Sequence, residues 1–185
     1  MSDYYIFTDF ETTGLKITAT DLPIEIGMIL ADDEYNILDS YSAYINPFDS
    51  AKTSWTDYEL QAYKVHNIPF TTIRNEGLLP LRVVNEINDL IDKQKNIDKH
   101  NSRFIIMSDN GQFEYNSMQM LYKIVDKSDS FPFHYAAWDV NILTNSVQKV
   151  MKGKVSHKAI QDAFRTYKTV IRALERNGFR KWEKY

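Results

Sequence analysis

The segment YYIFTDFETTG, from Tyr4 to Gly14, carries the strongest structural signal in the chain. Its first five residues are rich in aromatic and β-branched side chains, which predicts a buried β-strand. Asp9 and Glu11 follow at positions i and i+2, so the pleat of a strand places both carboxylates on one face. The Thr-Thr-Gly sequence after them predicts a turn. We therefore expect a strand that ends in two neighbouring acids.

Two carboxylates held side by side repel each other and are costly to bury in the charged form. Hard divalent cations remove that cost, because Mg²⁺ and Mn²⁺ prefer carboxylate oxygens. The alternative is an ordinary strand end with solvated acids. The choice between the two depends on whether the chain supplies more ligands.

A second candidate segment lies near the C-terminus, at His157-Lys158-Ala159-Ile160-Gln161-Asp162. Ser156 is a plausible N-cap for a helix that starts here. In a fully helical segment His157 and Asp162 would lie about 140° apart, so we expect His157 on the lead-in to the helix. The alternatives are a surface or capping histidine and a helix-dipole aspartate. The helix is predicted from apolar residues spaced three and four apart, namely Ile160, Ala163, Phe164, Tyr167, Val170, Ile171 and Leu174.

A third candidate lies in the middle of the chain. Arg103 to Met107 reads as a strand, and Ser108-Asp109-Asn110-Gly111 is a turn signal. A helix is predicted from Phe113, which places Glu114 near a helix start and close to a strand end. The alternative is a glutamate favoured there by the helix dipole alone.

Together these segments resemble the DEDDh family of 3′–5′ exonucleases, which includes proofreading subunits, RNase T and oligoribonuclease. The first motif of the family, Asp-x-Glu with a Thr-Thr-Gly turn, is matched at Asp9 and Glu11. The third motif, His-x-Ala-x-x-Asp, is matched at His157, Ala159 and Asp162. Each motif alone is weak, but their order and spacing across most of the chain are specific.

The second motif of the family usually reads Asn-x-x-Phe-Asp, whereas this chain has Asn110-Gly111-Gln112-Phe113-Glu114. Glu114 thus stands in place of the usual aspartate. Two weaker similarities lie between the motifs. Pro23 to Gly27 resembles the second strand of the family, and Val65-His66-Asn67-Ile68 resembles its His-Gly-Ile segment.

The resemblance implies a single-stranded DNA or RNA 3′ end as partner and the release of nucleoside 5′-monophosphates. It also implies two Mg²⁺ or Mn²⁺ ions, which generate hydroxide and stabilise the leaving oxygen. Asp9 would bridge both ions, Glu11 and Asp162 would hold the ion with the attacking water, and Glu114 would help to hold the other. His157 would be the general base, because the tyrosine branch of the family needs Tyr where this chain has Lys158.

The resemblance further implies that Thr12, Leu15 and His66 contact the terminal nucleotide. Preference for DNA or RNA is left open, since it depends on contacts to the 2′-hydroxyl. The competing interpretation is a catalytically weak or inactive nuclease-like domain that grips 3′ ends. Glu114 motivates this alternative, because a carboxylate misplaced by about 1 Å can cost about 100-fold in rate.

Length and composition agree with an enzyme of this kind. The 185 residues suit a single exonuclease domain, 1–185. The chain has no cysteine, so thiolate metal sites and disulfides are excluded. It has no apolar run long enough for a membrane span and no signal peptide pattern, so we expect an intracellular protein. Oligomeric state is left open.

The order of predicted elements favours an α/β fold of RNase H-like type, a three-layer sandwich around a central mixed β-sheet. A three-strand start with hairpin connections is followed by alternating helices and strands. The elements expected are strands at 4–9, 24–31, 37–45, 103–107 and 135–138, and helices at 57–64, 79–93 and from 113, with two closing helices.

Charge is distributed unevenly. Residues 149–185 hold eleven Lys and Arg against three acids, while the preceding residues hold eleven against twenty-two. This asymmetry predicts a basic surface around the C-terminal helices that can follow a phosphate backbone. A solvated helix face with scattered cations is the alternative.

Overall fold

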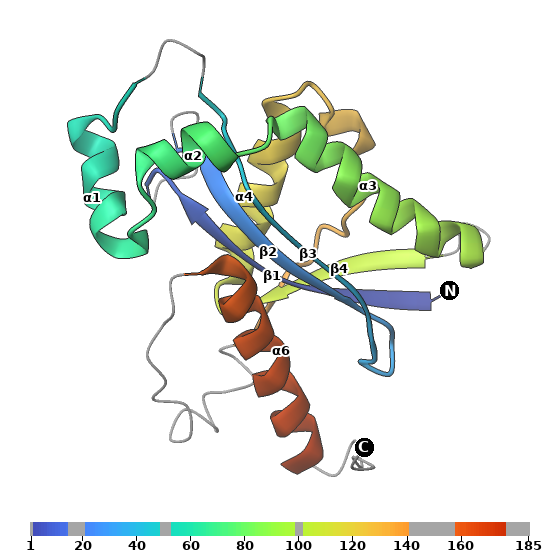
Figure 1. Ribbon diagram of the computed structural model, residues 1–185. Helices are drawn as coiled ribbons and strands as arrows, with labels where there is room; N and C mark the ends of the chain where they lie inside the picture. Colours follow the sequence, from blue (N-terminus) through green and yellow to red (C-terminus); the bar gives the residue numbers. More distant parts are fainter. Residues whose placement is uncertain (1, 15–20, 49–52, 99–101, 141–157, 177–185) are drawn as a thin grey trace.

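The protein is described by a computed structural model that places residues 2–14, 21–48, 53–98, 102–140 and 158–176. A five-stranded sheet in the order β3-β2-β1-β4-β5 forms its centre (Figure 1). The first three strands pair antiparallel, whereas β4 runs parallel to both β1 and β5, so the sheet is mixed. The strands are β1 (Ser2–Thr12), β2 (Pro23–Ala31), β3 (Ile37–Tyr44), β4 (Ser102–Ser108) and β5 (Trp138–Asp139).

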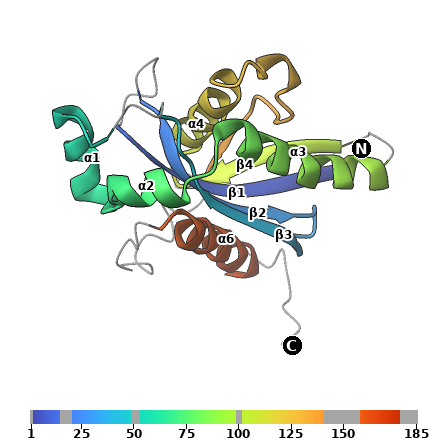
Figure 2. The same cartoon turned by 45° about the horizontal axis from the view of Figure 1, so that its top comes forward.

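Helices cover both faces of the sheet, which gives three layers (Figure 2). Alternate residues of β1 point to opposite faces. Ile6 faces the core formed with helices α3 and α4, and Phe7 faces the core formed with α6. The helices are α1 (Asp57–His66), α2 (Phe70–Glu76), α3 (Pro80–Ile97), α4 (Gly111–Lys123) and α6 (Ala159–Arg176), with a 3₁₀ turn at Ser128–Ser130.

The predicted fold class is confirmed by this mixed sheet between two helical layers. Helix α2 was not predicted, because its seven residues after Pro69 are too few for a periodic apolar pattern. Helices α1 and α3 run beyond their predicted ends at Lys64 and Lys93. No described helix is long and apolar enough to cross a membrane.

The strand predicted near Tyr135 to Trp138 is present, but it starts later than predicted. The chain touches β4 at an isolated bridge between Phe104 and Phe133, and β5 contains only Trp138 and Asp139. Between these contacts the His134 Nδ1 atom accepts a hydrogen bond from the Ala136 N–H at 3.2 Å. A second closing helix falls on residues outside those described.

Candidate active site

The site lies at the edge of the sheet where the parallel strands end. Asp9 and Glu11 belong to the same alternate set of β1 residues as Phe7, so both start from the face that α6 covers. β1 and β4 are paired as far as Phe7 and Met107. Two residues farther along each chain, Asp9 and Asp109 therefore meet at this edge.

Glu114 reaches the same edge from α4. The N-cap of this helix is Asn110, whose side chain accepts a hydrogen bond from the Phe113 N–H at 3.4 Å. This cap places Glu114 in the first helical turn, where its side chain is only 5% exposed. The Phe10 N–H donates a hydrogen bond to its carboxylate, while Oε2 has no hydrogen-bond partner among the described residues. A buried carboxylate with one unpartnered oxygen is a candidate cation ligand.

Asp162 is contributed by the first turn of α6 and is also buried. Arg165, one turn later, contacts Asp162 at 3.3 Å and Asp109 at 3.1 Å through its two terminal nitrogens. The Thr166 hydroxyl donates a hydrogen bond to Asp109 at 3.3 Å. These contacts tie α6 to the end of β4 and fix Asp162 beside the acids of β1.

The carboxylates influence one another strongly. Burial raises the pKa of Asp9 well above its usual range, and the charges of Glu11 and Asp162 raise it further. Burial raises the pKa of Glu114 as well, with the Asp9 charge as the second cause. Burial and the charges of Glu25 and Asp162 raise the pKa of Glu11 to about 7. The acids of β1, α4 and α6 thus form one electrostatic cluster with an excess of negative charge.

These donors fit hard divalent cations in their chemistry, because all four are carboxylates and one has an unpartnered buried oxygen. Among the described residues, however, no three His, Asp or Glu side chains are gathered closely enough to form a ready-made metal cage. The acids lie within electrostatic reach of one another, and a cation would draw them together by removing their repulsion.

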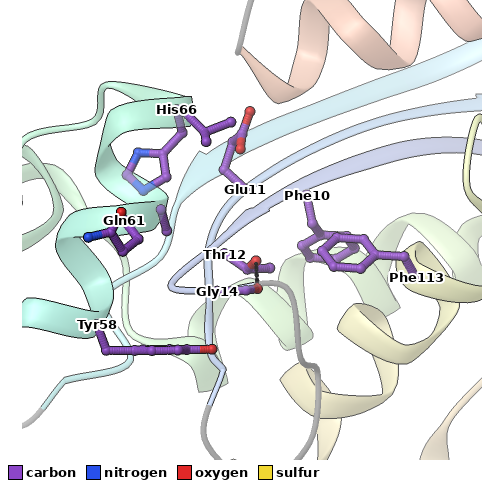
Figure 3. A pocket seen from close by; sticks show the side chains of 10 residues that line it. Phe10, Glu11, Thr12, Gly14, Tyr58, Gln61, His66 and Phe113 are labelled. Atoms are coloured by element: carbon purple, nitrogen blue, oxygen red, sulfur yellow. Dashed lines mark hydrogen bonds between the residues drawn. The ribbon is translucent and has the colours of Figure 1, made fainter.

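An apolar cavity of about 400 Å³ adjoins the carboxylates on the side of α1 (Figure 3). Glu11 lies at its boundary with the acidic cluster. The cavity is lined by Phe10, Glu11, Thr12 and Gly14 from β1 and the following turn, by Tyr58, Gln61, Ala62, Val65 and His66 from α1, and by Phe113 from α4.

Two predicted substrate contacts, Thr12 and His66, line this cavity. The Thr12 hydroxyl donates a hydrogen bond to the Gly14 carbonyl at 2.6 Å, so its backbone and methyl group are what it offers to a ligand. The His66 Nδ1 atom accepts a hydrogen bond from the Ile68 N–H at 2.9 Å, which assigns the ring proton to Nε2. Asn67 lies in the left-handed region of backbone conformation, with a φ of 55°. It stands where the His-Gly-Ile segment of the family has glycine, a residue that adopts this conformation readily.

Tyr58 forms the outer part of the cavity wall and was not among the predicted residues. Its hydroxyl donates a hydrogen bond to Asp21 Oδ1 at 2.6 Å, which links α1 to the chain entering β2. Its ring lies so close to Gly14 that a Cβ atom there would overlap the phenol. This contact gives a physical reason for glycine after the two threonines, but no local pattern in the sequence indicates it.

Glu25 is a further buried acid that the predicted site left out. It pairs with Glu11 across β1 and β2 and accepts a hydrogen bond from the Ala159 N–H at 3.3 Å. A charged residue inside the buried run of β2 was the available signal in the sequence. Two predicted residues, His157 and Leu15, lie outside the described residues, and so does the proposed N-cap Ser156.

Comparison with known families gives one match across most of the chain. Residues 6–170 match the family model RNase T, whose description is exonuclease. No curated protein matches the sequence significantly.

Similar folds occur among solved structures. E. coli Exonuclease I in complex with a dT13 oligonucleotide superposes with a TM-score of 0.68 at 15% identity, over 95% of this chain and 42% of that one. Its complex with a dA16 oligonucleotide gives a TM-score of 0.67 at 16% identity, over 94% of this chain and 41% of that one. The chain therefore spans less than half of the Exonuclease I chain.

S. pombe Pop2p in its Mg²⁺- and Mn²⁺-bound form superposes with a TM-score of 0.54 at 11% identity, over 97% of this chain and 86% of that one. At these identities the superpositions establish a common fold.

Proposed function

Since the chain belongs to the RNase T family of exonucleases, we propose that it is a metal-dependent 3′–5′ exonuclease. It releases nucleoside 5′-monophosphates from single-stranded DNA or RNA. The observation that carries this proposal is the convergence of acids from β1, α4 and α6, of which Glu114 and Asp162 are buried, beside a cavity of about 400 Å³.

Two Mg²⁺ or Mn²⁺ ions are the cofactors we propose. Asp9 would contact both, Glu11 and Asp162 would hold one, and Glu114 would hold the other through its unpartnered Oε2. Such ions supply Lewis acidity for the attacking water and the departing 3′ oxygen. Mg²⁺ and Mn²⁺ are also the ions bound by Pop2p in its structure of similar fold.

Proton transfer is assigned to His157, on the strength of the resemblance. An imidazole with an ordinary pKa near 6.5 is suited to accept a proton from water at neutral pH. His157 comes directly before Lys158 and Ala159, where α6 begins. Its place in the sequence, five residues before Asp162, supports this assignment.

The cavity beside Glu11 is proposed to hold the terminal nucleotide. Its aromatic and aliphatic lining, with Phe10 and Phe113 across from α1 (Figure 3), suits stacking and apolar contact with a base. Thr12, Leu15 and His66 are the proposed contacts.

The outer face of α6 is proposed to guide the rest of the strand. The exposed positions of this helix are Gln161, Lys168, Arg172 and Arg176, so three of the four are cations. A row of cations leading away from Asp162 suits a phosphate backbone. Oligonucleotides are the ligands in the Exonuclease I structures of similar fold.

The test is digestion of matched 5′-labelled DNA and RNA oligonucleotides with Mg²⁺, with Mn²⁺ and with chelator. We expect a ladder of products shortened from the 3′ end and mononucleotides that carry a 5′-phosphate. Asp9→Ala should abolish cleavage, because it removes the acid shared by both ions. Asp39→Ala, on exposed β3, is the matched control and should cleave like the native protein.

Two results would contradict the proposal. Full activity of Asp9→Ala would exclude the metal mechanism. Binding of 3′ ends without cleavage in any metal would favour the inactive, end-gripping domain instead.

A further inference from the structure

Glu25 is a buried charged side chain to which the proposed mechanism gives no role. β2 has the sequence PIEIGMILA, in which every residue is buried and Glu25 is the one charged residue. A buried carboxylate is costly unless it makes a specific interaction. The question is which interaction offsets that cost.

The interaction is a hydrogen bond to the start of α6. The Ala159 N–H, in the first turn of this helix, donates to Glu25 Oε2 at 3.3 Å, and both residues are buried. The first N–H groups of a helix have no partner within the helix and need an acceptor. Capping acceptors normally come from the residue just before the helix, whereas here the acceptor comes from a strand 134 residues away in sequence.

Gly27, on the same strand, makes this contact sterically possible. A Cβ atom at Gly27 would overlap the backbone of Ala159 and Ile160. The first turn of α6 therefore rests directly on the β2 backbone. Gly27 allows the close approach, and Glu25 holds the helix in register along the strand.

The hydrogen bond between Glu25 and Ala159 bears on the site through Asp162. This residue lies three positions after Ala159, in the same turn of α6, and is itself buried. Burial raises the pKa of Glu25 above its ordinary value, although the Ala159 hydrogen bond and the Lys158 charge oppose this rise.

We propose that Glu25 is a positioning residue, which caps α6 from β2 and thereby sets the place of Asp162 beside Asp9 and Glu11. It touches neither substrate nor cation in this role. The inference rests on the proposed function for its effect on cleavage, but the cap itself can be measured without any substrate.

The experiment compares two substitutions of similar volume, Glu25→Met and Glu25→Gln. Met keeps the bulk and removes the acceptor, whereas Gln keeps a carbonyl that can accept the Ala159 N–H. In metal-free protein, Glu25→Met should speed hydrogen exchange at the Ala159 amide by about tenfold, the effect of one lost hydrogen bond. Glu25→Gln should leave it nearly unchanged.

Metal affinity and kinetics follow the same pair of variants. With Mn²⁺ alone as the probe, Glu25→Met should weaken binding and Glu25→Gln should restore it. In cleavage assays Glu25→Met should lower kcat by about 10- to 100-fold, since a displaced ligand misplaces the reacting groups, with KM changed less than about twofold. Tyr4→Phe, which removes a hydrogen bond to Asp98 at the far end of β1, controls for loss of stability alone.

Failure of the proposed function and failure of the positioning role of Glu25 give different results. If the native protein cleaves no oligonucleotide, the proposed function fails, while exchange at Ala159 and Mn²⁺ affinity still decide the positioning role. Unchanged exchange and affinity in Glu25→Met would overturn it. Equal impairment of Glu25→Met and Glu25→Gln would also overturn the positioning role, because the charge rather than the acceptor would then matter. A rise in KM at constant kcat in Glu25→Met would overturn it too.

Discussion

Glu114 is one methylene longer than the aspartate that the second motif of the family usually carries. Its carboxylate is buried, receives one hydrogen bond from the Phe10 N–H and keeps Oε2 without a described partner. The longer side chain thus spans from the first turn of α4 to β1. A shorter side chain from the same backbone position would have to give up part of this reach.

We predict that Glu114→Asp slows cleavage, although it recreates the usual residue of the family. The shortened carboxylate retreats from Asp9 and from the Phe10 N–H, and a displacement of about 1 Å costs about 100-fold in rate. The loss should be larger with Mg²⁺ than with Mn²⁺, because Mg²⁺ demands near-ideal octahedral geometry. The measurement is kcat in each metal.

Glu86→Asp on α3 is the control, since it shortens a glutamate in the helical layer away from the acids of β1. A faster Glu114→Asp enzyme would show that Glu114 is a mild defect rather than a compensated ligand. Kinetics unchanged in both metals would show that Glu114 is no ligand.

At the scale of the elements, the pairing of β1 with β2 sets Glu11 opposite Glu25. The pKa of Glu11 is raised to about 7 by burial, by Glu25 and by Asp162, against an ordinary value of 4.5. The folded state therefore binds more protons than the unfolded state between these values. Its free energy of unfolding should fall as pH rises through that window.

We predict that metal-free protein melts at a higher temperature at pH 5.5 than at pH 7.5, and that Glu11→Gln reduces the difference. Mg²⁺ should reverse the trend, because it binds the deprotonated carboxylates. Glu86→Gln is the control, since the pKa of Glu86 is lowered and its titration lies at more acid pH. If the melting temperature of the metal-free protein instead rises from pH 5.5 to pH 7.5, the predicted direction of the pH dependence is wrong.

Helix α1 forms one wall of the cavity beside Glu11 and is tied to the entry of β2 by the Tyr58–Asp21 hydrogen bond. We predict that Tyr58→Phe raises KM about fivefold with kcat nearly unchanged, because one hydrogen bond worth about 1 kcal/mol holds this wall. Steady-state kinetics on a short oligonucleotide measure the split. Tyr63→Phe, on the same helix but outside this cavity, is the control, and an equal effect there would refute the role of Tyr58.

Prediction from sequence succeeded where the signal was local. The apolar run before Asp9 and the alternation that puts Glu11 on the same face predicted β1 and its acids, and the spacing three and four residues apart predicted α6. Tyr58 and the Glu25 cap could not be predicted in this way. Both depend on contacts between segments distant in sequence, and such contacts leave no periodic pattern in either segment.

At the scale of the whole molecule, the net charge of the chain is negative, whereas the exposed face of α6 is positive. The chain carries a net charge of −3, yet the exposed positions of α6 are mostly cations. Four of the acids lie at the end of the sheet, and three cations lie on the exposed face of α6. This arrangement suits the proposed binding of a nucleic acid along α6 with its 3′ end among the carboxylates.

We predict that Lys168→Ala combined with Arg172→Ala weakens substrate binding and flattens its salt dependence. Each phosphate contact to a single strand contributes about 0.7 to the slope of log affinity against log salt, so two lost contacts reduce the slope by about 1.4. Arg82→Ala with Lys93→Ala on α3 removes the same charge from the opposite layer and should leave the slope unchanged. Equal slopes in the two double variants would exclude α6 as the surface that contacts the phosphate backbone.

The acids of the proposed site come from positions 9, 11, 114 and 162, and the last of them lies on the helix whose first turn bonds to Glu25 of β2. In chain order, β1 to β5 and the helices α3 and α4 all precede α6. Until α6 docks on Gly27, the carboxylate set is incomplete. The proposed hydrolysis therefore requires this docking step, whichever nucleic acid is the substrate.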